Sequence, residues 1–122
     1  MLNLSKAKIA IVGLGYVGLP LALEFSKKFP TVGYDINKER INELEKGHDH
    51  TLEIQDDVLS SNITNISYTS NIKDTQDCNV YIITVPTPID DANQPDLTPL
   101  IESSSAVADV LNKNDIVIYE ST

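Results

Sequence analysis

The chain carries the sequence IAIVGLGYVG at residues 9–18. Its first four residues are continuously apolar, as in a parallel strand that is covered on both faces. Three glycines follow in the pattern G-x-G-x-x-G, directly before a helical segment. Gly13 permits a tight turn, Gly15 lets a diphosphate approach the backbone, and Gly18 allows the helix to pack closely on the sheet. The segment therefore predicts a strand-to-helix turn whose free amides bind a diphosphate.

An acidic residue stands at the matching place on the next apolar run. Asp35 ends residues 31–35 and lies 20 residues after Gly15. There its carboxylate is expected to accept hydrogen bonds from the ribose hydroxyls of a dinucleotide. The same charge repels a 2′-phosphate, so we predict NAD rather than NADP as the cofactor. Arg40, on the following helix, either leans over the adenosine or is an ordinary charge on a solvated helix face.

Apolar runs alternate with helical patterns along the whole chain. This alternation is typical of a parallel sheet with crossover helices, so we predict an α/β domain of the Rossmann type, a doubly wound sheet between two helical layers. We expect one domain, residues 1–122, which stops before the sixth strand that such a sheet normally has. The predicted strands are 9–12, 31–35, 66–69, 80–85 and 116–119.

The helices are predicted from apolar spacing and from capping residues. One follows Gly18 and ends before Pro30, a second is capped by Asn37 and stopped by Gly47, and a short one lies within residues 51–65. A fourth is expected to begin with Thr98 as cap and Pro99 in its first turn. The inner face of the first is predicted to hold Val17, Leu21, Phe25 and Phe29, and that of the fourth Ile101, Ser104, Ala108 and Leu111.

Two further segments lie where parallel strands end, the edge at which open α/β sheets bind ligands. Val85, Pro86 and Thr87 follow the fourth strand. Glu120 and Thr122 hold the equivalent place after the fifth. All five are candidate cofactor contacts.

Composition narrows the possible partners. The 122 residues are 41% hydrophobic and carry a net charge of −9. Such an acidic surface repels phosphate backbones and anionic lipid, so we expect neither nucleic acid nor a membrane as partner. The single cysteine, Cys78, forms no internal disulfide, and the apolar runs are too short to span a bilayer. A cytoplasmic protein is expected.

Three other features suggest chemistry less strongly. His48, Asp49 and His50 are neighbours on a loop and converge poorly on one ion, so a solvated loop is favoured over a metal site. Cys78 stands next to an acidic residue, which raises a thiol pKa and disfavours a nucleophilic role. Asp90 and its neighbour in the proline-rich loop are expected to face solvent. We predict no metal ligands and no catalytic residues in this chain.

Four motifs together identify a family. GLGYVGLP at 13–20, TVPTP at 84–88, PDLTP at 95–99 and YEST at 119–122 occur in this order. The chain resembles the N-terminal domain of the UDP-glucose/GDP-mannose dehydrogenase family over essentially its whole length. The Thr-Pro-Ile loop and the Tyr-Glu-Ser-Thr end are most similar to the bacterial branch that oxidises UDP-N-acetylglucosamine or UDP-N-acetylgalactosamine at C6 for capsule and O-antigen sugars.

The resemblance implies roles for several residues. Tyr16 and Val17 contribute to the diphosphate loop, and Arg40 lies beside the adenosine. Thr87 and Thr122 are cofactor-contacting threonines, and Glu120 lies near the nicotinamide. Members of the family continue with a central helix, a sugar-binding domain and a catalytic cysteine, use two NAD per UDP-sugar, and are usually homodimers. A chain with only this part is expected to bind NAD without oxidising a UDP-sugar.

Two other functions share the first forty residues. One is a free-standing nucleotide-sensing module of the kind that regulates ion transport, and the other is a different NAD-dependent hydroxyacid dehydrogenase. The nucleotide-sensing modules have no reason to carry the TVPTP loop or the YEST end, and a hydroxyacid dehydrogenase is expected to diverge after the first forty residues. A reading frame that continues beyond Thr122 to a glycine-flanked cysteine favours the nucleotide-sugar enzyme.

Overall fold

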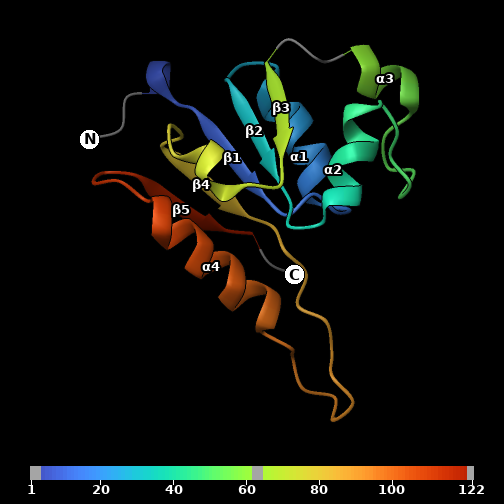
Figure 1. The fold of residues 1–122 in the computed structure, drawn as a ribbon, viewed down its shortest axis with the longest axis vertical. Coiled ribbons are helices and arrows are strands. Elements are labelled where there is room, and N and C mark those ends of the chain that lie inside the picture. The colour runs from blue at the N-terminus through green and yellow to red at the C-terminus, as the bar shows by residue number, and fades with distance from the viewer. Residues whose placement is uncertain (1–3, 62–64, 121–122) are drawn as a thin grey trace.

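The computed structural model describes residues 4–61 and 65–120 and contains one parallel sheet. The strands lie in the order β3-β2-β1-β4-β5, which confirms the predicted doubly wound topology (Figure 1). The order reverses between β1 and β4, so a switch point lies at their carboxyl ends. The strands are β1 (Ile9–Val12), β2 (Thr31–Tyr34), β3 (Ile66–Thr69), β4 (Val80–Ile83) and β5 (Ile116–Tyr119).

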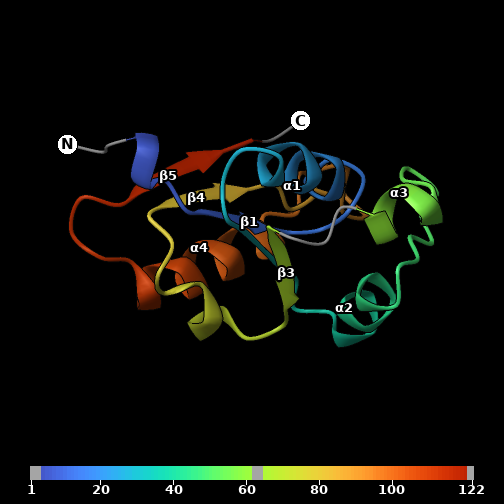
Figure 2. The ribbon, with the colours of Figure 1, turned by 90° about the horizontal axis from the view of Figure 1, so that it is seen from above.

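Helices cover both faces of the sheet, as Figure 2 shows for α1 and α4. Apolar side chains of α1 and α2 share one buried cluster with one sheet face, while α4 packs on the opposite face. Within the described residues, no helix is long and apolar enough to cross a membrane. The helical elements are η1 (Leu4–Lys6), α1 (Gly18–Ser26), α2 (Lys38–Glu45), α3 (Asp56–Ser61), η2 (Ile72–Thr75) and α4 (Thr98–Val110).

The core follows the alternation of side chains along each strand. On β1, Ile9 and Ile11 face α1, whereas Ala10 and Val12 face α4. All four residues of β1, β2 and β4 are buried. On β5, by contrast, three of four residues are exposed. Continuous apolar runs therefore predicted the central strands well, because those strands are covered on both sides.

The predicted inner stripe of α1 is confirmed in part, because Leu21, Phe25 and Phe29 are partly buried and pack against the core cluster. Val17 precedes the helix and is 41% exposed, and Leu21 and Phe25 are only half-buried. Residues spaced strictly by four rotate about 40° per step around a helix of 3.6 residues per turn, so such a stripe leaves the buried face. The buried positions of α1 follow three- and four-residue spacing, at Gly18, Leu19, Ala22, Leu23 and Ser26.

The limits of α2 were predicted correctly. The Asn37 side chain accepts hydrogen bonds from the amides of Glu39 and Arg40, at 3.0 and 3.3 Å. After the helix, Gly47 has φ +80°, the left-handed conformation expected of a helix stop. The short helix expected within residues 51–65 is α3.

The start and inner face of α4 differ from the prediction. Thr98 is the first helical residue, and its amide donates to Asp96 Oδ1 at 3.0 Å, so the cap carboxylate comes from two residues earlier. Pro99 lies in the first turn as expected. Ile101 is 63% exposed, because Val107 is the residue that meets the sheet. The sequence of α4 is short and contains several serines, so two of its faces are similarly apolar. Contact with the sheet decides which of the two is buried.

Candidate functional site

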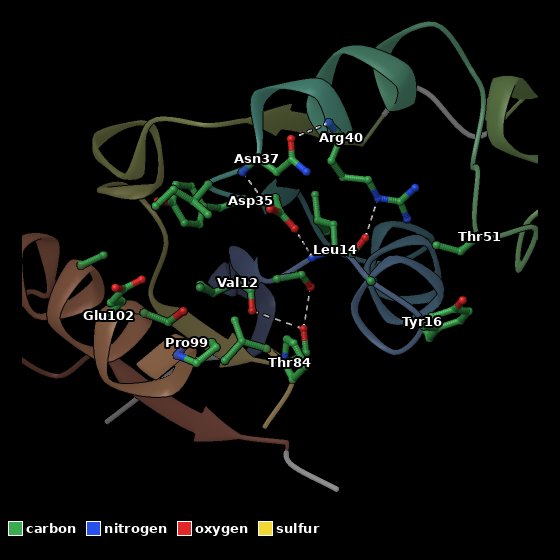
Figure 3. A pocket seen from close by; sticks show the side chains of 18 of the residues that line it. Val12, Leu14, Tyr16, Asp35, Asn37, Arg40, Thr51, Thr84, Pro99 and Glu102 are labelled. Atoms are coloured by element: carbon green, nitrogen blue, oxygen red, sulfur yellow. Dashed lines mark hydrogen bonds between the residues drawn. The ribbon is translucent and has the colours of Figure 1, made fainter. Parts of the chain in front are cut away.

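A cavity of about 470 Å³ opens at the carboxyl ends of β1, β2 and β4. Its size lies in the range of small-molecule sites. One wall is the turn between β1 and α1 together with the end of β2, and the other is the start of α4 (Figure 3). The lining residues are Val12, Gly13, Leu14, Gly15, Tyr16, Tyr34, Asp35, Ile36, Asn37, Arg40, His50, Thr51, Thr84, Val85, Pro86, Pro99, Glu102, Ser103 and Ala106.

Two glycines of the turn are required by its geometry. Gly13 has φ +104°, and a Cβ there meets a side-chain atom of Val85 at 2.9 Å. A Cβ on Gly18 lies 1.7 Å from the Gly13 carbonyl oxygen. The same Cβ lies 2.6 Å from the Thr84 hydroxyl oxygen, so Gly18 is needed where α1 closely approaches the residues that follow β1 and β4, in agreement with the predicted close packing of helix on sheet.

A glycine at position 15 is explained in a different way. No atom lies within 4 Å of a Cβ built at this position, so the protein itself leaves room for a side chain. The space beside Gly15 belongs to the cavity. The backbone at Gly15 is therefore open to the cavity, and its role in the approach of a diphosphate remains a prediction.

Asp35 points toward the glycine turn, as Figure 3 shows. Its Oδ2 accepts from the Leu14 amide and its Oδ1 from the Asn37 amide, both at 2.9 Å. A carboxylate has about four acceptor positions, so this one retains capacity for ligand hydroxyls. Asp35 thus joins the turn and the start of α2 at the edge of the cavity.

Arg40 is buried, with 4% of its surface exposed, so of the two alternatives for this residue the solvated helix charge is wrong. Nε donates to the Leu14 carbonyl oxygen at 2.7 Å. Nη1 donates to Asp49 at 2.8 Å and to Glu43 at 2.5 Å, and lies 3.4 Å from His50 Nδ1. Arg40 lines the cavity, and its contact with adenosine remains a prediction.

Asp49 was missed by sequence reasoning, which placed it on a solvated loop. Its side chain is fully buried and also accepts hydrogen bonds from Thr51 and from the amides of Glu53 and Ile54. Burial opposes its ionisation, yet these bonds and the one from Arg40 lower the pKa of Asp49 from 3.8 to about 2. An aspartate two residues before a threonine in a polar loop is a turn signal that pointed to this arrangement.

The two histidines beside Asp49 are exposed. Within residues 4–61 and 65–120, no group of three or more His, Cys, Asp or Glu side chains is placed to hold a metal. His48 contacts Asp56 at 3.1 Å, and His50 contacts Glu43.

Thr84 is a second residue that the sequence analysis did not single out. The strand β4 ends at Ile83, earlier than predicted, and Thr84 begins the loop. Its buried hydroxyl donates to the Gly13 carbonyl at 2.6 Å. Its place directly after a parallel strand, equivalent to that of Asp35 after β2, was the available signal.

The cavity gathers most of the predicted site residues and leaves out some. Thr122 lies outside the described residues. The predicted site residues that line the cavity are Gly13, Gly15, Tyr16, Asp35, Arg40, Val85 and Pro86. Those described but not among the lining residues are Val17, Gly18, Thr87 and Glu120.

Two residues considered for catalysis have other surroundings. Cys78 is buried beneath α4, and burial raises its thiol pKa to about 11, with Asp77 as a smaller contributor. Asp90 faces solvent, and its Oδ1 accepts from the amides of Ala92 and Gln94, which shapes the exposed loop. Neither forms part of the cavity.

A glycine turn with a free helix start, a carboxylate facing it from β2 and a cavity at the switch point define a dinucleotide-binding α/β domain. Residues 7–122 match the model of the UDP-glucose/GDP-mannose dehydrogenase family, NAD binding domain. The chain therefore belongs to the UDP-glucose/GDP-mannose dehydrogenase family as its NAD-binding domain, which confirms the resemblance drawn from the four motifs.

Individual relatives agree with this assignment. The chain is 58% identical to a UDP-N-acetyl-D-glucosamine 6-dehydrogenase of Pseudomonas aeruginosa over 94% of its length, and 54% identical to one of Salmonella typhi over its full length. A solved UDP-D-ManNAc dehydrogenase from Pyrococcus horikoshii superposes with a TM-score of 0.86 at 36% identity over 94% of the chain. The chain spans 27%, 28% and 28% of these proteins, respectively.

Proposed function

We propose that this chain binds NAD for an enzyme that oxidises the C6 alcohol of a UDP-N-acetylhexosamine, foremost UDP-N-acetylglucosamine, to a carboxylate. The observation that carries the proposal is the identity of 58% and 54% with two UDP-N-acetyl-D-glucosamine 6-dehydrogenases. Oxidation of an alcohol to a carboxylate removes two hydrides, and NAD supplies the acceptor for each.

The glycine turn holds the diphosphate of the cofactor in this proposal. The free amides after Leu14 and the start of α1 favour an anion locally, despite the net charge of −9. Tyr16, 67% exposed, and Val17 flank this place. The open space beside Gly15 supports the assignment, since no side chain blocks the approach.

Asp35 takes the ribose hydroxyls of the adenosine. Its carboxylate faces the turn and lines the cavity. A 2′-phosphate at the same place meets this negative charge, so the site selects NAD over NADP. The far wall, formed by Pro99, Glu102 and Ser103 of α4, then lies on the adenosine side of the cavity.

The residues after β4 and β5 serve the other end of the cofactor. Val85 and Pro86 line the cavity beside Gly13. Thr87, Glu120 and Thr122 follow the same two strands, and we assign them to the nicotinamide side on the basis of the family resemblance.

The rest of the reaction is assigned to further parts of the whole protein. We propose that the sugar-binding domain, the catalytic cysteine and the surface of a homodimer lie outside these 122 residues, with residues 1–122 as the NAD-binding domain. Cys78 is buried with a raised thiol pKa, which disfavours it as the nucleophile. A single free cysteine agrees with a place in the reducing cytoplasm.

The test is an assay of the whole protein with NAD and, separately, UDP-N-acetylglucosamine, UDP-N-acetylgalactosamine and UDP-glucose. We expect two NADH per molecule of UDP-N-acetylglucosamine and slower turnover of UDP-glucose. The 122-residue chain alone is expected to bind NAD and to form no NADH. Absence of NADH with either UDP-N-acetylhexosamine contradicts the proposal, and NADH formed by the short chain alone contradicts the assignment of catalysis to other segments.

A further inference from the structure

Two consecutive carbonyl groups of the glycine turn are each held by a side chain from elsewhere in the fold. The Gly13 carbonyl accepts from the Thr84 hydroxyl at 2.6 Å. The Leu14 carbonyl accepts from Arg40 Nε at 2.7 Å. Both contacts join residues that are distant in sequence, so the tertiary fold, rather than the turn alone, fixes the direction of these peptide groups.

The direction of each carbonyl determines where the next amide points, because C=O and N–H of a trans peptide point in opposite directions. The Gly13 carbonyl points to Thr84, and the Leu14 amide on the opposite side donates to Asp35 Oδ2 at 2.9 Å. By the same rule, the bond from Arg40 to the Leu14 carbonyl directs the Gly15 amide away from Arg40. Within residues 4–61 and 65–120, that amide donates to no protein acceptor.

Arg40 is itself fixed by a buried anion. Arg40 and Asp49 are 4% and 0% exposed, and Nη1 lies 2.8 Å from Asp49 Oδ1. The Asp49 carboxylate is held in turn by the amides of Thr51, Glu53 and Ile54. A rotation of Arg40 toward the adenosine leaves a buried carboxylate without its cation, which is costly.

Two of the three guanidinium nitrogens, Nε and Nη1, are already bonded to protein acceptors. Nη1 is bonded to Asp49 and, nearer the surface of α2, to Glu43. Nη2 is buried and has no partner within the described part of the chain. In Figure 3 the Arg40 side chain extends beside Leu14 toward Thr51, away from Asp35.

We infer that Arg40 and Asp49 are positioning residues that act through the Leu14 peptide to aim the Gly15 amide at the diphosphate of the cofactor. This role differs from the adenosine contact that the family resemblance implies for Arg40, and it assigns a function to Asp49. The inference rests on the proposed binding of NAD.

Ligands that contain parts of NAD separate the two roles. Calorimetric titration of the whole protein with NAD, ADP and adenosine is compared between the unchanged protein and Asp49→Asn. Asp56→Asn is the matched control, because it removes the same charge from an exposed side chain of the same segment. Arg40→Lys is the second variant, since lysine keeps the charge near Asp49 but lacks the fork that reaches the Leu14 carbonyl.

Asp49→Asn and Arg40→Lys are expected to weaken the binding of NAD and of ADP about tenfold, which is the contribution of one hydrogen bond to a charged group. The affinity for adenosine is expected to stay unchanged. Asp56→Asn is expected to match the unchanged protein with all three ligands. Equal losses for adenosine and ADP overturn the inference, since they place Arg40 on the adenosine. Unchanged NAD binding in both variants also overturns it. If the unchanged protein fails to bind NAD, the proposed function itself is contradicted.

Discussion

The two walls of the cavity are built in different ways. On the wall of β1, β2 and α2, Arg40 and Asp49 are buried, and side-chain hydrogen bonds hold the peptide groups of the glycine turn. On the wall of α4, Glu102 is exposed, and Val107 is the only fully buried side chain of that helix. The peptide groups of the glycine turn are therefore held mainly by side chains of the first half of the chain, and Thr84 contributes from the second half.

The largest effect on stability is expected at Gly18, where the wall of β1, β2 and α2 has no space for a side chain. Gly18→Ala places a Cβ 1.7 Å from the Gly13 carbonyl oxygen, so α1 must move away from the turn. We expect the free energy of unfolding, measured by urea denaturation, to fall by about 3 kcal/mol. Gly15→Ala, with no atom within 4 Å of its Cβ, should change it by less than about 0.5 kcal/mol. Equal losses for the two variants contradict this account of the turn.

A second pair of substitutions compares a central strand with the edge strand. Ile82 of β4 and Ile118 of β5 are register partners on the same sheet face, 5% and 42% exposed. We expect Ile82→Ala to lower the free energy of unfolding by about 3 kcal/mol and Ile118→Ala by about 1 kcal/mol. Thermal and urea denaturation check both values. A larger loss at Ile118 shows that β5 contributes more to stability than its exposure indicates.

Acid should destabilise the wall formed by β1, β2 and α2, because it protonates the Asp49 carboxylate. Its pKa is about 2 in the fold against an ordinary 3.8, so the stabilisation is present above about pH 4 and is lost as the pH falls through about 2. The shift corresponds to about 2 kcal/mol. Compared with Asp49→Asn, the unchanged protein should be more stable by this amount at pH 7 and nearly equal to it at pH 2. A difference that stays constant between these pH values contradicts the assignment.

The smallest expected change is one of ligand preference. Asp35→Asn removes the charge that opposes a 2′-phosphate, so the ratio of NADP to NAD dissociation constants should fall about tenfold, as for a single charge and the nearly double charge of a phosphate about 5 Å apart in water. Calorimetry with both cofactors measures this ratio. Asp91→Asn, an equal change of net charge on the exposed loop, serves as the control. If this ratio does not change, the charge of Asp35 does not determine the preference for NAD.

The local features of the site were predictable from sequence, and the long-range ones were not. The glycine pattern, the place of Asp35 and the cap at Asn37 each depend on a few neighbouring residues, and the structure contains all three. The sequence left open whether Arg40 is a solvated helix charge, because its acceptor, the Leu14 carbonyl, lies 26 residues away. The role of Thr84 likewise depends on a contact across 71 residues.

The prediction of the inner face of α4 failed for a related reason. Its sequence offers apolar residues on more than one side, and the sheet selects Val107 while leaving Ile101 63% exposed. Sequence periodicity identifies a helical face only where one stripe is clearly more apolar than the others.

The most direct test of the account is an amide nuclear magnetic resonance titration of the chain with NAD. If the backbone of the glycine turn binds the diphosphate, the amide signals of Gly15 and Tyr16 should move on addition of NAD, together with the carboxyl carbon of Asp35. Shifts confined to α4 and to the loop at residues 86–96, with Gly15 and Asp35 unchanged, contradict it.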